Sequence, residues 1–568
     1  MLPSSFGYQV ISSLCHVLPW PIVIFEIADR LTDEFIALRP SWATIVGAAE
    51  HQDRWEDLSP PGWEQYADFA RRGIGEVQPF LTSHEPVLRH GARVIDGHLQ
   101  LVLDKVDNGD HLDELGHVGT PLQESRDMFD LMRRDSRDGW DDIIKRLHGY
   151  RELLRGYTET LDSGLQLGRA VAIRQVDAVT KQASALAGEE SPFDGLGREL
   201  ADAGFSDQDD QLTEAIEAAK QGCHRLAEYL ATSYRTEARS EDGVGRDRYE
   251  RAVLQNLGAS PDLHEIYLWG WDEIAAIRTR LVETARIIDP TSSVDEVLAD
   301  LEREPCAGSQ DEFADFVRER QLLAMEALDG VHFDVPPQAR EVKVNLAPPN
   351  VPLGAWYYPP SEDFSRLGSI WYALGERQEI ALYGQVSTAY HEGFPGHHLQ
   401  GVLAMSAAKD LCTRYQRLLM WSPGYDEGWG LYAERLMDEL GFFERPEYVM
   451  GYLTSQMFRA CRVVIDIGCH LKLPIPDHAP FFPGRQWDFD TAVEVMRTWG
   501  RLTDDNAESE VLRYLGLPAQ AIAYKVGERL ILDLRERAGL PLKEFHRRVL
   551  GYGPVRLDYL EELVLGEA

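Results

Sequence analysis

Residues 390–400 read Tyr-His-Glu-Gly-Phe-Pro-Gly-His-His-Leu-Gln, and this segment decides the fold and the chemistry expected of the chain. Its three histidines and one glutamate fall within eight residues. A helix is predicted from about residue 376 to 390, because Ile380, Tyr383 and Ser387 recur at helical spacing. His391 and Glu392 then end a buried helix, where polar side chains are costly without a partner. The segment therefore predicts a metal site.

The spacing differs from that of the zinc hydrolase motif His-Glu-x-x-His, whose histidines lie four apart on one helical face. Pro395 takes the place of the second histidine, and His397 and His398 follow His391 by six and seven residues. On a straight helix, six residues turn by about 600° to another face, and seven rise about 10.5 Å, too far for one metal. Pro395 and Gly396 are expected to form a bulge that brings His397 into the second ligand position. His398 would then support a ligand or an oxyanion; the reverse assignment stays open.

The third ligand is expected to be a carboxylate from residues 425–435, Tyr-Asp-Glu-Gly-Trp-Gly-Leu-Tyr-Ala-Glu-Arg. Glu427 follows His391 by 36 residues (427 − 391) at the start of a second predicted helix. Zinc hydrolases with two histidines and one glutamate take their third ligand from such a helix. Glu434 lies two turns further along the same face, so it is expected to support a ligand or to pair with Arg435 or another arginine.

The two motifs His-Glu-x-x-Pro-Gly-His-His and Glu-Gly-Trp-x-Leu-Tyr-x-Glu resemble those of the bacterial domain-of-unknown-function 885 family. The resemblance extends over residues 28–60, 459–470 and 513–527, with Ala519 where the family usually has glycine. That family is grouped with the gluzincin metallopeptidases. The resemblance implies a gluzincin-like fold, mainly α with a small β-sheet, whose helices wall a deep cleft. It also supports Glu427 as a ligand, because Glu-Gly-Trp is similar to the Glu-Gly-Phe ligand segment of gluzincin aminopeptidases.

Further polar residues of the C-terminal half are candidates for the same site. The resemblance makes Tyr524 the first candidate for steadying an oxyanion and His470 the second. Asp466 interrupts an apolar run and is expected either to support the site or to be satisfied in the core. The residues expected to bind a substrate carboxylate, where the arginines could equally form structural ion pairs, are Arg459, Arg462, Arg513 and Tyr514.

Composition limits the partners and the compartment. The 568 residues carry a formal net charge of −37, which disfavours nucleic acid and anionic membranes as partners. The six cysteines form no Cys-x-x-Cys pair, which fits a reducing compartment. The first 25 residues contain no lysine or arginine, unlike a signal peptide, and no apolar run is long enough to span a membrane. A cytoplasmic protein is expected, with export as the alternative, and the oligomeric state is unknown.

The chain divides by pattern into residues 1–330 and 331–568. The first region is predicted to be helical and to form one wall of the cleft, with residues 188–210 as a mobile connection. The second begins with short strands near 331–335, 341–346, 356–358 and 369–372, then returns to helices. This second region would hold the metal site.

Together these patterns predict a hydrolase with one Zn²⁺ per chain, held by His391, His397 and Glu427. Glu392 would act as general base on a water that attacks an amide bond of a short peptide or acyl-amino substrate. Two histidines and a carboxylate also describe a non-haem Fe(II) oxygenase, and an inactive metallopeptidase-like binding protein is the other alternative. Neither alternative needs a carboxylate beside the first ligand, so Glu392 favours the hydrolase.

Overall fold

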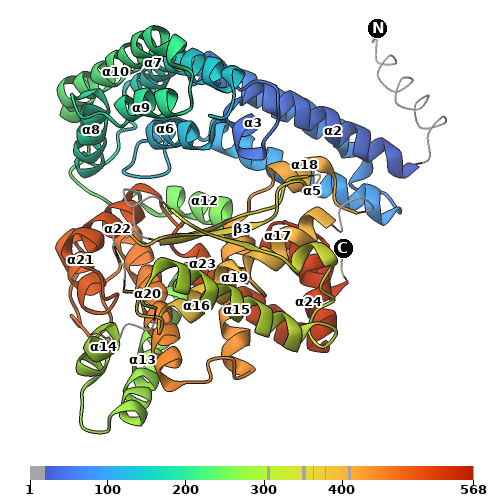
Figure 1. Ribbon diagram of the computed structural model, residues 1–568, viewed down its shortest axis with the longest axis vertical. Coiled ribbons are helices and arrows are strands. Elements are labelled where there is room, and N and C mark those ends of the chain that lie inside the picture. Colours follow the sequence, from blue (N-terminus) through green and yellow to red (C-terminus); the bar gives the residue numbers. More distant parts are fainter. Residues whose placement is uncertain are drawn as a thin grey trace. The chain divides into compact units, whose positions relative to one another are not determined.

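The computed structural model describes residues 20–303, 307–347, 354–362, 364–375, 377, 379–406 and 411–566 (Figure 1). The chain forms two compact units, Met1–Asp242 with Thr413–Leu419, and Gly243–Cys412 with Met420–Ala568. It is mainly helical, about 69%, with one small three-stranded sheet among the described residues. The expectation of a mainly α fold with a small sheet is therefore confirmed. Cys15 and Cys306 lie outside the described residues.

The first unit is built from helices alone in the part that the structure describes. They are α2 (Trp20–Leu38), α3 (Ser41–Val46), α4 (Pro60–Val77), α5 (Pro86–Asp107), α6 (Pro121–Leu131), α7 (Arg137–Gln166), α8 (Ile173–Ala187), α9 (Gly195–Asp202), α10 (Asp209–Tyr229), α11 (Arg235–Glu237) and α18 (Arg414–Leu419). The periodic apolar residues of α2 include Leu31 and Phe35, which are buried against α4 and α5. Tyr415 and Leu419 of α18 complete this core, although they follow it by more than 300 residues.

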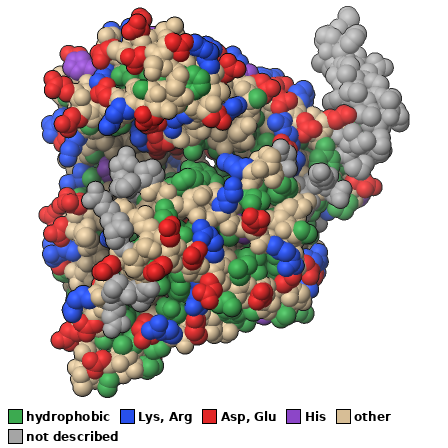
Figure 2. Space-filling model, viewed as in Figure 1, with side chains coloured by type: hydrophobic (Ala, Val, Ile, Leu, Met, Phe, Trp, Pro, Cys, Tyr) green, Lys and Arg blue, Asp and Glu red, His purple; other side chains and the backbone are tan. Residues whose placement is uncertain are grey.

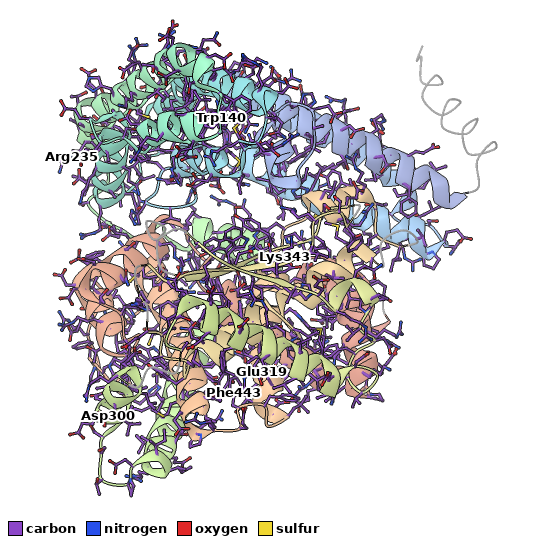
Figure 3. The ribbon with its side chains drawn as sticks, viewed as in Figure 1. Trp140, Arg235, Asp300, Glu319, Lys343 and Phe443 are labelled. Atoms are coloured by element: carbon purple, nitrogen blue, oxygen red, sulfur yellow. The ribbon has the colours of Figure 1, made fainter. Side chains whose placement is uncertain are left out.

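A second core of the first unit surrounds α7, whose Trp140 lies fully buried among the helices (Figure 3). On the same helix the side chain of Arg146 is fully buried and pairs mainly with main-chain acceptors. Its guanidinium donates to the carbonyls of Pro40 at 3.0 Å and Arg54 at 3.2 Å, and to Thr44 Oγ1 at 2.7 Å. Arg146 thus anchors the segment between α3 and α4.

The second unit combines helices with the sheet. Its elements are α12 (Arg246–Leu257), α13 (Leu263–Ile288), α14 (Val294–Arg303), α15 (Gln310–Leu328), β1 (Lys343–Leu346), β2 (Gly354–Tyr358), β3 (Ser369–Ala373), α16 (Gln385–Glu392), α17 (His397–Ser406), α19 (Pro423–Glu439), α20 (Pro446–Leu471), α21 (Phe489–Thr498), α22 (Asp504–Gly516), α23 (Ala523–Ala538), α24 (Leu542–Gly551) and α25 (Leu557–Leu565). Helices α16, α17, α19, α20 and α23 contact one another and surround the candidate site.

The sheet has the strand order β1-β3-β2, in which β1 runs parallel and β2 antiparallel to β3. Phe313 of α15 packs edge-on against Tyr372 of β3, with ring centroids 4.9 Å apart. Burial and the nearby Glu392 carboxylate raise the pKa of Tyr372 well above its usual range, which shows that β3 lies beside the end of α16. The sheet therefore supports the helix that carries His391.

Three segments differ from the prediction. Residues 331–335 form a turn instead of a strand. Apolar and polar residues alternate in this segment because the side chains of Phe333 and Val335 enter the core from the turn. The helix expected from residue 376 begins only at Gln385. Within 188–210, expected to be a mobile connection, α9 buries Leu196 and Leu200, which lie one helical turn apart.

Acidic side chains are scattered over the face shown in Figure 2, with basic side chains between them. Within the part of the chain that the structure describes, no helix is long and apolar enough to cross a membrane.

Candidate metal centre

Residues 393–396 make a sharp corner between α16 and α17. The N–H of Gly396 donates to the Tyr390 carbonyl at 3.1 Å, and the N–H of His398 donates to the Gly393 carbonyl at 3.2 Å. A Cβ atom on Gly396 would lie only 2.0 Å from the His391 carbonyl oxygen, so glycine alone fits here. The corner ends one helix at Glu392 and begins the next at His397.

Gln321 of α15 fixes this corner from outside. Its side chain, 1% exposed, donates from Nε2 to the Ala389 carbonyl at 2.6 Å and accepts from the Phe394 N–H. It thus satisfies the Phe394 N–H, which the broken helix leaves without a helical acceptor, and adds a second bond to the Ala389 carbonyl, which also accepts from the Gly393 N–H at 3.0 Å. Gln321 was not among the predicted site residues. Its one signal in the sequence is that a glutamine lies on the buried face of an amphipathic helix.

The corner brings together His391 of α16, His397 of α17 and Glu427 of α19. Glu427 Oε2 lies 3.3 Å from His391 Nε2 and 3.6 Å from His397 Nε2. All three ligand atoms lie within 4.8 Å of one another. A tetrahedral site with bonds of about 2.0–2.1 Å has ligand atoms about 3.3 Å apart, which is close to the two distances from Glu427. The group could therefore hold a metal ion.

Glu434 holds the far side of the His391 imidazole. Its Oε1 lies 2.8 Å from His391 Nδ1, and its Oε2 accepts from Ser387 Oγ at 2.5 Å and from Gln456 Nε2 at 3.4 Å. Arg459 Nη2 lies 3.6 Å from Oε1 and balances the charge of this fully buried carboxylate. A carboxylate on Nδ1 leaves Nε2 free for a metal, as in many carboxylate–histidine–metal sites.

His397 and His398, although adjacent, have different surroundings. His397 Nδ1 lies 3.2 Å from Gln400 Oε1, which leaves its Nε2 facing Glu427. His398 has both ring nitrogens occupied, with Nδ1 3.2 Å from the Tyr357 hydroxyl and Nε2 3.0 Å from the Ala339 carbonyl. Burial lowers the pKa of His398 to about 4. The structure thus places His397, and not His398, in the group with His391 and Glu427.

Helix α19 approaches the His391 ring closely because residue 430 has no side chain. A Cβ atom on Gly430 would lie 2.5 Å from His391 Cε1 and 2.8 Å from Nε2. The opposite side of α19 touches α23 in the same manner, since a Cβ on Gly428 would lie 2.7 Å from the Gly527 carbonyl carbon. This packing brings Tyr524 of α23 beside Glu427.

The charges in the group are strongly coupled. Burial opposes a charge on His391, but its hydrogen bonds to Glu427 and Glu434 outweigh burial and raise its pKa to about 10. His391 and His397 hold the pKa of Glu427 well below its usual range, although burial opposes this shift. Burial raises the pKa of Glu392, which has no side-chain hydrogen-bond partner among the described residues. A carboxylate in this state suits proton transfer.

The remaining candidates fall into two places. The first contains Tyr524, Arg462, Arg513 and Tyr514. Burial and the nearby Glu427 carboxylate raise the pKa of Tyr524 to about 12. The Arg462 guanidinium carbon lies 5.1 Å from the centre of the Tyr524 ring, and Arg462 and Arg513 share Glu510 with Tyr514.

His470 and Asp466 form a second place on α20, with Nε2 and Oδ1 3.4 Å apart. His470 Nδ1 accepts from the Val244 N–H at 3.2 Å, and Nε2 lies 3.0 Å from the Tyr514 carbonyl. Asp466 Oδ1 accepts from the Ala519 N–H at 3.4 Å. In this structure His470 and Asp466 therefore join α20 to the main chain around them.

The fold is similar to that of two solved structures. The chain is similar to the structure of the "putative lipoprotein from Colwellia psychrerythraea", with a TM-score of 0.83 and 21% identity over 97% of this chain and 100% of that one. It is also similar to "a putative lipoprotein of unknown function from Shewanella oneidensis", with a TM-score of 0.73 and 16% identity over 95% and 99%. No curated protein matches. A model described as "bacterial protein of unknown function (DUF885)" matches residues 40–564, and the chain therefore belongs to that family.

Proposed function

We propose that this protein is a zinc-dependent hydrolase, related in fold to the gluzincins, that cleaves an amide bond in a short peptide or acyl-amino substrate. The observation that carries the proposal is the state of Glu392. It adjoins His391, it is 8% exposed, and no described side chain hydrogen-bonds to its carboxylate. A buried carboxylate without a partner is costly, and it is explained by a reaction that uses it as a base.

The donor set suits zinc. Two imidazole nitrogens and one carboxylate oxygen, each directed by a further polar group, are the protein ligands of many catalytic zinc sites. Here the directing groups are Glu434 on His391 and Gln400 on His397. A bound Zn²⁺ would supply a Lewis acid and would lower the pKa of a coordinated water.

Glu392 supplies the proton transfers. It would take a proton from the attacking water and later give that proton to the leaving amine, and the burial that raises its pKa makes it a stronger base. The Tyr524 hydroxyl stays protonated because its pKa is about 12, so it can donate a hydrogen bond to the oxyanion. We assign Tyr524 this role because its neighbour Glu427 belongs to the metal group.

The test combines metal content with peptide turnover. The purified protein is analysed for bound metals and incubated with a peptide library, beside Glu392→Gln and Glu319→Gln. Glu319 lies on the exposed face of α15 and serves as the matched control (Figure 3). Cleavage that is lost in Glu392→Gln but kept in Glu319→Gln, with zinc bound to all three proteins, is the expected result.

Three results would overturn the proposal. Bound iron with O₂-dependent turnover would indicate the oxygenase. Bound metal without turnover of any peptide would indicate a binding protein. Cleavage unchanged in Glu392→Gln would remove this residue from the mechanism.

We also propose a cytoplasmic location and no nucleic-acid or membrane partner, on the basis of the acidic composition. The two solved structures are named putative lipoproteins, so cell fractionation is the appropriate test. Recovery with the membrane fraction would refute the cytoplasmic location.

A further inference from the structure

One face of α20 runs along the candidate site. Gln456, Arg459 and Arg462 are spaced three residues apart, so they lie on neighbouring turns of the helix. The first two reach Glu434, while Arg462 stands over the Tyr524 ring with its guanidinium carbon 5.1 Å from the ring centre. Tyr524 in turn lies near the Glu427 carboxylate, which raises the pKa of its hydroxyl. Arg462 is therefore one side chain away from a member of the metal group.

Arg462 and Arg513 share a single carboxylate. Glu510 Oε2 accepts from Arg462 Nη2 at 2.9 Å and from Arg513 Nη2 at 2.9 Å, and its Oε1 accepts from Arg513 Nε at 3.1 Å. The Tyr514 hydroxyl also donates to Glu510 Oε2, at 2.6 Å. Two guanidinium groups against one carboxylate leave one positive charge without a counter-charge.

Among the residues that the structure describes, Glu510 is the only carboxylate that forms an ion pair with Arg462 or Arg513. Asp466 forms no ion pair with either arginine, and burial raises the pKa of its carboxyl well above the usual range, which disfavours a charge on it. The Arg462 and Arg513 side chains are only 8% and 14% exposed. Burying an uncompensated charge is costly. The chain has 94 acidic residues and 57 basic ones, so the missing counter-charge does not reflect a shortage of acidic residues. Arg462 Nη1 also has no hydrogen-bond partner among the described residues.

We propose that Arg462, with Arg513 behind it, binds a carboxylate of the substrate beside the metal group. The inference rests on the proposed hydrolase and names its substrate class, namely short peptides that carry a carboxylate near the cleaved bond. Arginine binds carboxylates with two parallel hydrogen bonds, which gives both strength and direction. Arg459 differs, because its partner is Glu434 within the protein.

The carboxylate has two possible sources, the C-terminus of the peptide or an acidic side chain, and a binding experiment separates them. Calorimetry on zinc-loaded Glu392→Gln, which is expected to bind without cleaving, uses three probes: acetyl-Ala-Ala, its C-terminal amide, and acetyl-Ala-Glu-amide. Each is repeated with Arg462→Gln added, and with Arg280→Gln added as the control. Arg280 belongs to α13 and forms its ion pair with Asp438, a partner that it does not share with Arg462 or Arg513.

A probe with a carboxylate should bind about 100-fold more tightly than the neutral amide, because the amide leaves the buried guanidinium unpaired. Arg462→Gln should abolish this preference by weakening only the carboxylate probes, and Arg280→Gln should leave it unchanged. Preference for acetyl-Ala-Ala assigns the C-terminus, and preference for acetyl-Ala-Glu-amide assigns the side chain. Should Arg462→Gln fail to fold by thermal melting, Arg462→Lys replaces it and should reduce the preference, since lysine lacks the paired donors.

Equal binding of all three probes, or a preference that survives Arg462→Gln, would overturn the inference. Because binding is measured without turnover, this result is independent of whether the hydrolase proposal holds. Absence of peptide cleavage by the wild-type protein would count against the proposed function alone.

Discussion

Replacement of Gly430 by alanine should remove the metal while leaving the protein folded. The added Cβ would lie 2.5 Å from His391 Cε1 and 2.8 Å from Nε2. Ordinary carbon contacts need about 3.5–4.0 Å, so the ring must retreat by roughly 1 Å. Metal–ligand distances tolerate only about 0.2 Å. His391 would therefore leave the ligand position.

The size of the effect can be bounded. Loss of a residue that only orients a ligand costs about 10- to 100-fold in metal affinity, so displacement of the ligand itself should cost at least about 100-fold. The fold should survive, because alanine favours a helix over glycine by about 0.5–1 kcal/mol, which offsets part of an overpacking cost of about 1–3 kcal/mol.

Zinc affinity is measured by competition with a chromophoric chelator, and folding by circular dichroism on heating. Gly75→Ala is the matched control, because Gly75 lies within α4 and an added Cβ there would meet nothing within 4 Å. It should keep wild-type affinity and gain up to about 1 kcal/mol of stability. Wild-type zinc affinity in Gly430→Ala would refute the placement of His391 against α19.

Three further substitutions test the site and the first unit. His397→Ala should lose the metal after dialysis and His398→Ala should retain it, because only His397 faces Glu427. Glu434→Gln should weaken zinc binding by about 10- to 100-fold in the chelator competition, since the amide holds His391 less strongly than the carboxylate does. Arg146→Met should lower the free energy of unfolding in urea by about 3 kcal/mol, because it leaves several buried acceptors without a donor.

Each of these has a result that contradicts it. Metal retained in His397→Ala but lost in His398→Ala would exchange the roles of the two histidines. Unchanged affinity in Glu434→Gln would show that His391 does not depend on its carboxylate partner. Arg155, on the exposed face of α7, is the control for Arg146, and Arg155→Met should change stability little, as for most surface ion pairs. Equal effects of the two arginine substitutions would contradict the anchoring role of Arg146.

Local patterns in the sequence predicted the elements whose signals are local. Helix α15 lies in the region that was predicted to be helical, because Ser309 caps its start and its apolar residues follow the helical period. The segment 331–335 was misjudged as a strand, because alternate burial does not distinguish a strand from a turn whose side chains enter the core. Where the structure of a segment depends on its packing against distant residues, the local sequence does not predict that structure.

The same limit applies to the site. The metal-binding chemistry of His391, Glu392 and the histidines after them follows from residue types at short spacing. Two residues that support this arrangement come from other helices: Gln321 of α15 bonds the main chain of the corner, and Gln456 of α20 donates to Glu434. Glutamine has no distinctive spacing or charge, so neither residue could be identified before the helices were placed in space.

The corner at Gly396 has a consequence for how much variation the motif tolerates. In His-Glu-x-x-His the two intervening positions are part of a regular helix and accept many side chains. Here a side chain at position 396 would overlap main-chain atoms, at 2.0 Å from the His391 carbonyl oxygen, and main chain cannot move aside as a side chain can. In a saturation mutagenesis library selected for metal retention, position 396 should thus be as intolerant as the ligand positions, although glycine has no atom to offer an ion.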